Sequence, residues 1–142
     1  MNEAGDNALR FDGLYYRVSG RITSFLRFFP DGSVIGTSIA RSRTSPYAGA
    51  LRRWWHREKS PPALDPQAMA AKMASWFNAQ WSGERGTYQL QGTQLEFFTT
   101  SSAGRVDHRG TIGVDSLLLD SHNQALGHRT AKFTYRYAPF KP

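Results

Sequence analysis

The densest group of side chains suited to binding stands at residues 51–57, LRRWWHR, which hold Arg52, Arg53, Trp54 and Trp55. A guanidinium group forms paired hydrogen bonds with carboxylates and phosphates. Exposed tryptophan rings are typical of surfaces that meet single-stranded nucleic acid, an anionic membrane or a protein partner. The alternative interpretation is that the tryptophans fold back over the mouth of the domain and leave the arginines in solvent.

A second candidate group is a stripe of large apolar side chains at helical spacing. Met69, Met73, Trp76 and Phe77 follow one another at i, i+4, i+7 and i+8, which places them on one face of a helix. Such a stripe is usually core, but methionine also adapts to irregular ligand surfaces. We therefore predict a ligand lined by Trp54, Trp55, Met69, Met73, Trp76 and Phe77, with its anionic group held by Arg52 and Arg53.

Catalytic and metal-binding patterns are sparse. His108 lies on an alternating strand and could face an interior, but the adjacent Asp107 then points to the opposite face and cannot orient it. Asp120, His122 and His128 surround one turn, and we interpret them as part of a solvated turn rich in Asn, Ser and Gly rather than as metal ligands. The sequence has no glycine-rich phosphate loop, no Gly-x-Ser-x-Gly and no cysteine. We expect a non-catalytic module without a metal or a cofactor.

Charge is concentrated in one segment of the 142-residue chain. The net charge is +7, and residues 41–59 contribute +5 of it, so the rest of the chain is nearly neutral. A basic segment on a neutral body favours an anionic partner for that segment alone. No run of 18 apolar residues is present and the first ten residues are polar, which predicts a cytoplasmic protein with no membrane span.

The elements that must position these residues are mostly strands. Leu14, Tyr16 and Val18 alternate onto one face of the first strand, and Ala131, Phe133, Tyr135 and Tyr137 onto one face of the last. Pro30-Asp31-Gly32 is a hairpin turn, and Asp65-Pro66 is a helix start. The pattern predicts one helix over 66–80 and eight strands, at 11–19, 24–29, 33–40, 87–91, 94–100, 105–112, 114–120 and 128–138.

Eight short strands with tight turns favour an antiparallel meander closed into an up-and-down barrel, because closure removes exposed strand edges. A barrel of this size is filled by side chains or holds one small ligand. We predict a mostly β domain over 11–142, with the helix inserted between strands three and four. A disordered tail covers 1–10 and a long basic connection covers 41–65. The alternative is an open sheet packed on the helix.

Three ordered motifs carry a resemblance to a known family. They are FDGLY at 11–15, LRFFPDGSV at 26–34 and GTYQL at 86–90. Together they resemble the lipocalin-like (calycin) domain that follows the F-box in one class of F-box proteins. The F-box itself has no counterpart here, so recruitment to a ubiquitin ligase is not implied.

The resemblance also implies a closed barrel end. In lipocalins a Gly-x-Trp on the first strand packs beneath a basic residue of the last strand. Gly13-Leu14-Tyr15 stands at the matching place, with Tyr for Trp and Arg136 as the candidate partner. The helix between strands three and four departs from the secreted transport lipocalins, which carry theirs after the last strand.

These expectations combine into one leading hypothesis and two alternatives. The leading one is a binding module for a small apolar or amphipathic ligand, entering at the end edged by the 41–65 connection and the helix. The first alternative is a protein–protein or regulatory module with a filled barrel that uses the basic aromatic segment 41–59. The second is a polyanion or nucleic-acid binder, whose affinity would fall steeply with salt.

Overall fold

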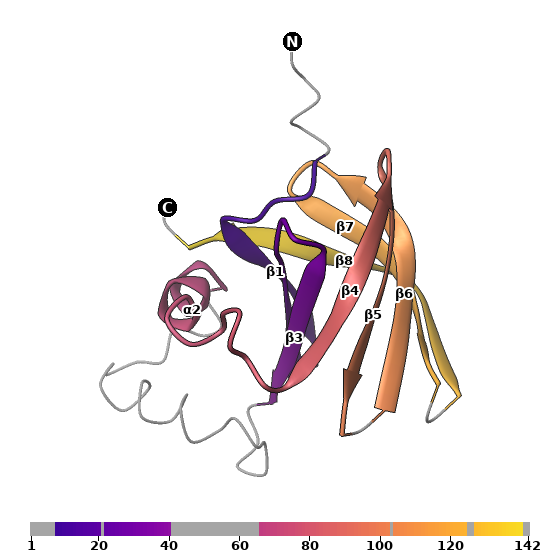
Figure 1. The fold of residues 1–142 in the computed structure, drawn as a ribbon, viewed down its shortest axis with the longest axis horizontal. Helices are drawn as coiled ribbons and strands as arrows, with labels where there is room; N and C mark the ends of the chain where they lie inside the picture. The colour runs from indigo at the N-terminus through magenta and orange to yellow at the C-terminus, as the bar shows by residue number, and fades with distance from the viewer. Residues whose placement is uncertain (1–7, 21, 41–65, 103, 125–126, 141–142) are drawn as a thin grey trace.

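Eight strands form a closed, all-antiparallel barrel in the computed structural model, which describes residues 8–20, 22–40, 66–102, 104–124 and 127–140 (Figure 1). Each strand pairs with its neighbour in the chain, and β1 pairs with β8 to close the ring. The predicted up-and-down barrel is confirmed. The elements are β1 Gly13–Ser19, β2 Ile22–Phe28, β3 Ser33–Ala40, α2 Pro66–Met73, β4 Glu84–Gln91, β5 Gln94–Ser101, β6 Gly104–Gly113, β7 Ser116–Asn123 and β8 His128–Pro139.

The β2–β3 turn has the predicted chemistry. The Asp31 carboxylate accepts hydrogen bonds from the backbone N–H and the hydroxyl of Ser33, at 2.9 and 2.6 Å. Gly32 follows with φ +97°, a conformation that side chains with a Cβ rarely adopt. The backbone of Phe29 then pairs with Ser33, which starts the hairpin.

Replacing Gly32 with valine is expected to lower the free energy of unfolding by at least about 1 kcal/mol, because a β-branched residue is strained at positive φ. Chemical denaturation measures the loss, and Gly32→Asn should cost less since asparagine tolerates this region. Equal, near-zero losses in both variants would mean that the turn tolerates a Cβ of any shape.

The inward-facing side chains form an apolar plug in one half of the barrel. Tyr15 is fully buried there, with the rings of Phe28 and Tyr137 edge-on to it at 5.7 and 5.3 Å between centroids. The plug draws on seven of the eight strands. Its buried residues are Leu9, Tyr15, Leu26, Phe28, Val34, Leu95, Phe97, Ile112, Leu117, Leu119, Phe133 and Tyr135.

Helix α2 packs on the outer wall of the barrel rather than in its mouth. Its buried Met69, Ala70 and Met73 lie against the outward-facing apolar residues of β1, β2, β3 and β8. The helix ends at Met73, earlier than the predicted residue 80, and the chain continues in turns through 74–80. Phe77 extends the same apolar surface, and its backbone carbonyl accepts a hydrogen bond from Arg27 at 2.7 Å. No helix in the described part of the chain is long and apolar enough to cross a membrane.

The residues before β1 cover the plug at one end. Leu9 is 7% exposed and belongs to the plug, and the backbone N–H of Arg10 donates to the Tyr15 hydroxyl at 2.9 Å. The Arg10 guanidinium lies over the Tyr137 ring at 4.4 Å. The prediction that Arg136 caps Tyr15 is wrong, because Arg136 alternates to the exposed outer face while its neighbour Tyr137 points inward.

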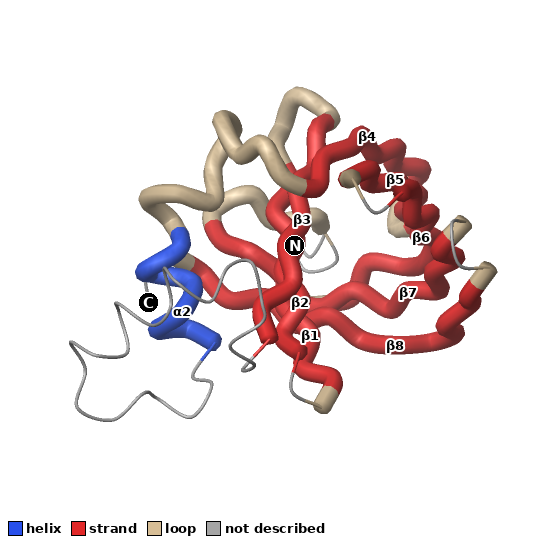
Figure 2. Tube along the Cα trace, turned by 90° about the horizontal axis from the view of Figure 1, so that it is seen from below, coloured by secondary structure: helices blue, strands red, loops and turns tan. Residues whose placement is uncertain are grey.

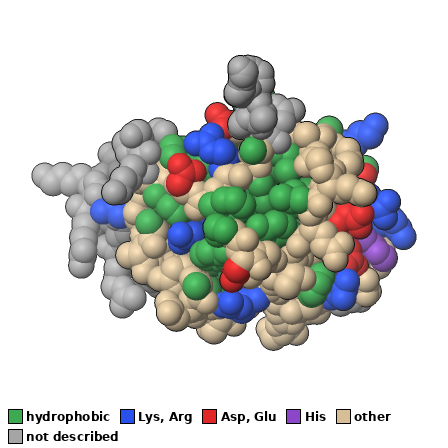
Figure 3. Space-filling view, turned by 45° about the horizontal axis from the view of Figure 1, so that its top comes forward, with side chains coloured by type: hydrophobic (Ala, Val, Ile, Leu, Met, Phe, Trp, Pro, Cys, Tyr) green, Lys and Arg blue, Asp and Glu red, His purple; other side chains and the backbone are tan. Residues whose placement is uncertain are grey.

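Further aromatic side chains lie at this covered end and beside helix α2. Phe11, Tyr88 and Tyr137 are partly buried against the plug, and Phe29 and Phe140 against the α2 cluster. Figure 3 shows apolar side chains gathered on the face that this end presents. The interior is therefore closed at this end by packed rings.

Candidate functional site

The structure places half of the predicted ligand residues. Met69, Met73 and Phe77 are 0–1% exposed in the contact between α2 and the outer wall. Trp76 is partly buried, with its ring 6.1 Å from that of Phe77 and 5.5 Å from that of Trp81. Arg52, Arg53, Trp54, Trp55 and the whole basic segment 41–59 lie outside the described residues. A ligand role for this set stays a prediction.

A different group of side chains converges inside the barrel. The same inward alternation also places one polar side chain from each strand beside or beyond the plug, and Tyr135 belongs to both groups. We call this set the polar layer. Its members, in strand order from β1 to β8, are Arg17, Ser24, Ser38, Glu84, Thr99, His108, Ser121 and Tyr135.

Hydrogen bonds join several members of the layer, chiefly between neighbouring strands. Ser24 and Ser38 share a hydrogen bond of 3.0 Å, and Ser24 also hydrogen-bonds with the Tyr135 hydroxyl. The Thr99 hydroxyl donates to one oxygen of the Glu84 carboxylate. A Cβ at Gly36 would stand 2.9 Å from the other Glu84 oxygen, so a glycine opposite Glu84 leaves room for that carboxylate.

The layer holds two opposite charges. The Arg17 guanidinium stacks on the Phe133 ring at 4.3 Å. Arg17 and Glu84 both act electrostatically on the Tyr135 hydroxyl, yet no ion pair joins the two charges in the part of the chain that the structure describes. Burial is the main cause that raises the pKa of Tyr135 to about 12, followed by the Glu84 charge, so its proton stays on at neutral pH.

After Tyr135, His108 is the most buried ionisable side chain of the layer. Its ring stacks on Phe97 with 4.4 Å between centroids and 13° between planes. Its Nδ1 atom is buried and has no hydrogen-bond partner among the described residues. Burial lowers the pKa of His108 to about 4, with a smaller opposing effect of Asp107, so the ring is neutral at physiological pH. As predicted, Asp107 faces outward, where it forms an ion pair of 2.9 Å with Arg105.

The polar layer reaches solvent. Arg17, Ser24, Glu84 and Ser121 are partly exposed and Ser38 is exposed, in contrast to the plug. The layer lies toward the end of the barrel where β3 finishes and the 41–65 connection begins, opposite Leu9. Figure 2 views the molecule from this side. This is the end at which the sequence predicts ligand entry.

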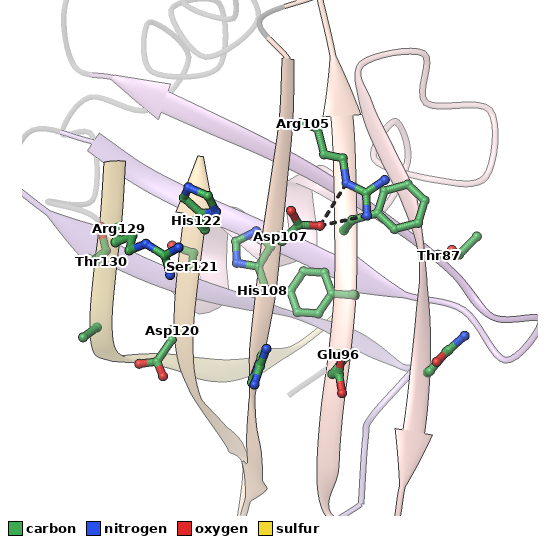
Figure 4. A pocket seen from close by; sticks show the side chains of 15 residues that line it. Thr87, Glu96, Arg105, Asp107, His108, Asp120, Ser121, His122, Arg129 and Thr130 are labelled. Atoms are coloured by element: carbon green, nitrogen blue, oxygen red, sulfur yellow. Dashed lines mark hydrogen bonds and ion pairs between the residues drawn. The ribbon is translucent and has the colours of Figure 1, made fainter. Parts of the chain in front are cut away.

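A second concave surface lies on the outside of the same strands. It is an open groove of about 830 Å³ across β4–β8 (Figure 4). Its outward-facing side chains alternate with the inward-facing set, and Phe97, His108 and Ser121 also line it. The outward-facing charged residues of the groove are Glu96, Arg105, Asp107, Arg109, Asp120 and Arg129, and His122 lies among them.

The charges of this groove are largely balanced within it. Arg105 pairs with Asp107 and lies 4.1 Å over the Phe98 ring, and Gln124 donates to the same carboxylate. Arg109 stands in register between Glu96 and Asp120. Three arginines face three acids, which is the alternation that stabilises a solvated sheet surface. No group of three or more potential metal ligands occurs within the described ranges, and the side chain of His128 lies outside them.

Comparisons of the chain with protein-family models, with curated proteins and with solved structures find no match. The candidate site therefore rests on the chemistry and positions of its own residues.

Proposed function

We propose that this chain is a non-catalytic, lipocalin-like binding protein that holds a small amphipathic molecule at the polar layer. One observation carries the proposal: each of the eight strands contributes an inward-facing polar side chain beside or beyond the apolar plug. A few polar groups converging beside an apolar surface is the usual composition of a small-molecule site.

A purely structural role explains this layer poorly. Placing ionisable groups in a barrel interior costs free energy unless each is paired. The buried Nδ1 atom of His108 has no hydrogen-bond donor or acceptor among the described residues. Unsatisfied buried polar atoms are rare in folded proteins and call for a specific cause. A bound molecule supplies one.

The lipocalin-like assignment is supported by the covered end of the barrel. Tyr15 on β1 fills the position of the family's tryptophan and lies beneath a guanidinium-capped aromatic ring, that of Tyr137 under Arg10. The basic residue comes from the segment before β1 instead of the last strand. The fold implies only a capacity to bind, since the same barrel serves many activities.

The protein-interface and nucleic-acid hypotheses depend on the segment 41–59, which stays a prediction from its sequence. They differ from the proposal in one measurable respect. Binding through that segment would weaken steeply with salt, whereas binding in a partly buried layer is screened less.

The proposal is tested with the fluorescent amphipathic anion 8-anilinonaphthalene-1-sulfonate. We expect the wild-type chain to bind the dye, and Ser38→Trp to weaken binding at least about tenfold because the indole fills the layer. Thr134→Trp is the matched control, since Thr134 is exposed on the outer face of β8. Dye binding that is absent, or that is equally strong in both variants, overturns the proposal. Native mass spectrometry after gentle purification shows in parallel whether a ligand is retained.

A further inference from the structure

We infer that the molecule held at the polar layer has a zwitterionic head group, with a cationic nitrogen beside Glu84 and a carboxylate beside Arg17. This inference rests on the proposed function and names the class of its ligand. The juxtaposition that carries it joins two groups on different walls of the layer: a guanidinium with no ion-pair partner among the described residues, and a carboxylate with unused acceptor positions.

Glu84 supplies the anionic side. A carboxylate offers about four acceptor positions, and the Thr99 hydroxyl occupies one on the first oxygen. The second oxygen lies beside Gly36, which has no side chain to fill the place next to it. The β3–β5 wall therefore keeps acceptor capacity for an N–H group of a ligand, and a charged nitrogen makes the stronger hydrogen bond.

Arg17 supplies the cationic side, on the wall formed by β1 and β8. Its flat face is taken up by the Phe133 ring at 4.3 Å. The N–H groups point outward in the plane of a guanidinium, so stacking leaves them available. No ion-pair partner for them occurs in the described ranges. A fixed planar fork of N–H groups is suited to a carboxylate.

The two charges share the layer with hydroxyl groups. Arg17 and Glu84 both influence Tyr135, whose hydroxyl is hydrogen-bonded to Ser24, but they do not pair with each other within the described residues. A ligand with only an anion would meet Glu84, and one with only a cation would meet Arg17. Repulsion between these like charges weakens the binding of a singly charged ligand. The layer therefore favours a ligand whose head group carries both a positive and a negative charge.

The rest of the ligand is expected to be uncharged. The neighbouring wall is the stacked pair Phe97 and His108, whose imidazole adds no third charge at neutral pH. Aromatic faces favour flat apolar groups. An aromatic amino acid and its two singly charged analogues therefore form a matched set of probes.

The experiment compares L-phenylalanine, 3-phenylpropionate and 2-phenylethylamine by calorimetry and by chemical-shift changes of the layer. We expect the zwitterion to bind at least about tenfold tighter than either analogue, a difference of about 1.4 kcal/mol. In Arg17→Gln, L-phenylalanine should bind no more tightly than 2-phenylethylamine. In Glu84→Gln, it should bind no more tightly than 3-phenylpropionate. Arg136→Gln, an equal loss of charge on the outer face next to Tyr135, should leave all three affinities unchanged.

Two further variants keep the test decisive if a neutral substitution fails to fold. Arg17→Lys and Glu84→Asp retain the charges and should preserve the ranking of the probes. The dye could bind at the layer while the three probes bind equally, or while a singly charged probe binds tightest. The inference of a zwitterionic head group is then wrong and the proposed function stands. If neither the dye nor any probe binds, the proposed function fails with it.

Discussion

Replacing Tyr15 with alanine is expected to lower the free energy of unfolding by about 3–5 kcal/mol, the range for removing a large buried aromatic side chain. Tyr15 has no exposed surface and touches two aromatic rings at the covered end. The variant also removes the acceptor for the backbone N–H of Arg10, which adds an unsatisfied donor to the cavity. Urea denaturation followed by circular dichroism measures the loss.

Two variants separate the ring from its hydroxyl and from general effects on β1. Tyr15→Phe should cost only about 1 kcal/mol, since the ring contacts remain and one hydrogen bond is lost. Tyr16→Ala removes the next side chain, which is partly buried on the outer face, and should cost less than Tyr15→Ala. A loss at Tyr15 no larger than that at Tyr16 would show that the covered end contributes little to the stability of the barrel.

Alternation and turn chemistry were sufficient to predict the barrel. Strand order, closure and the position of the helix follow from eight short segments and from turns such as Asp31–Gly32. The inward face of β8 was also predictable, because Phe133 and Tyr135 are apolar while Thr134 and Arg136 are exposed.

In the first strand, the alternation of apolar residues does not identify the face that points into the barrel. The predicted apolar face of Leu14, Tyr16 and Val18 is the outer one, and Val18 is 45% exposed on it. Tyr15 and Arg17 point inward instead. Helix α2 covers the start of β1 from outside, so both faces of that strand are apolar there, and the sequence of one strand cannot say which face is the interior.

The polar layer was missed for related reasons. Glu84 and Ser121 fall outside the predicted strands, which start at 87 and end at 120, whereas β4 begins at Glu84 and β7 runs to Asn123. Ser24, Ser38 and Thr99 read as ordinary strand residues because their neighbours lie on other strands, far away in the chain. Only the register brings them together. His108 was identified as a possible inward residue, but its orphaned Nδ1 depends on packing that no local pattern reports.

Lowering the pH from 7 to 4.5 is expected to destabilise the protein through His108 by about 2.5 kcal/mol. The folded pKa of His108 is about 4, below the ordinary value of 6.5, because burial disfavours the imidazolium ion. Between these two values the unfolded chain takes up a proton that the folded protein does not. The contribution is therefore fully present above pH 6.5, declines as the pH falls, and is lost completely below pH 4.

The size of this effect follows from the gap between the two pKa values, which corresponds to about 3 kcal/mol at the acid limit. Carboxylates with lowered pKa values, such as Asp12 and Asp31, lose their own contributions at lower pH, so the window above pH 4.5 isolates the histidine. Denaturation midpoints at half-unit pH intervals give the slope directly.

His108→Phe removes the titrating group while keeping a flat ring against Phe97. Its stability should change less between pH 7 and 4.5 than that of the wild type, by about the same 2.5 kcal/mol. His122→Gln, on the outer face of the next strand, keeps His108 and should retain the wild-type profile. Identical slopes for the wild type and His108→Phe would mean that the imidazole accepts a proton without leaving its place. Water would then reach the ring in the folded protein. The Nδ1 atom would be hydrated, and its missing hydrogen-bond partner would no longer support a bound ligand.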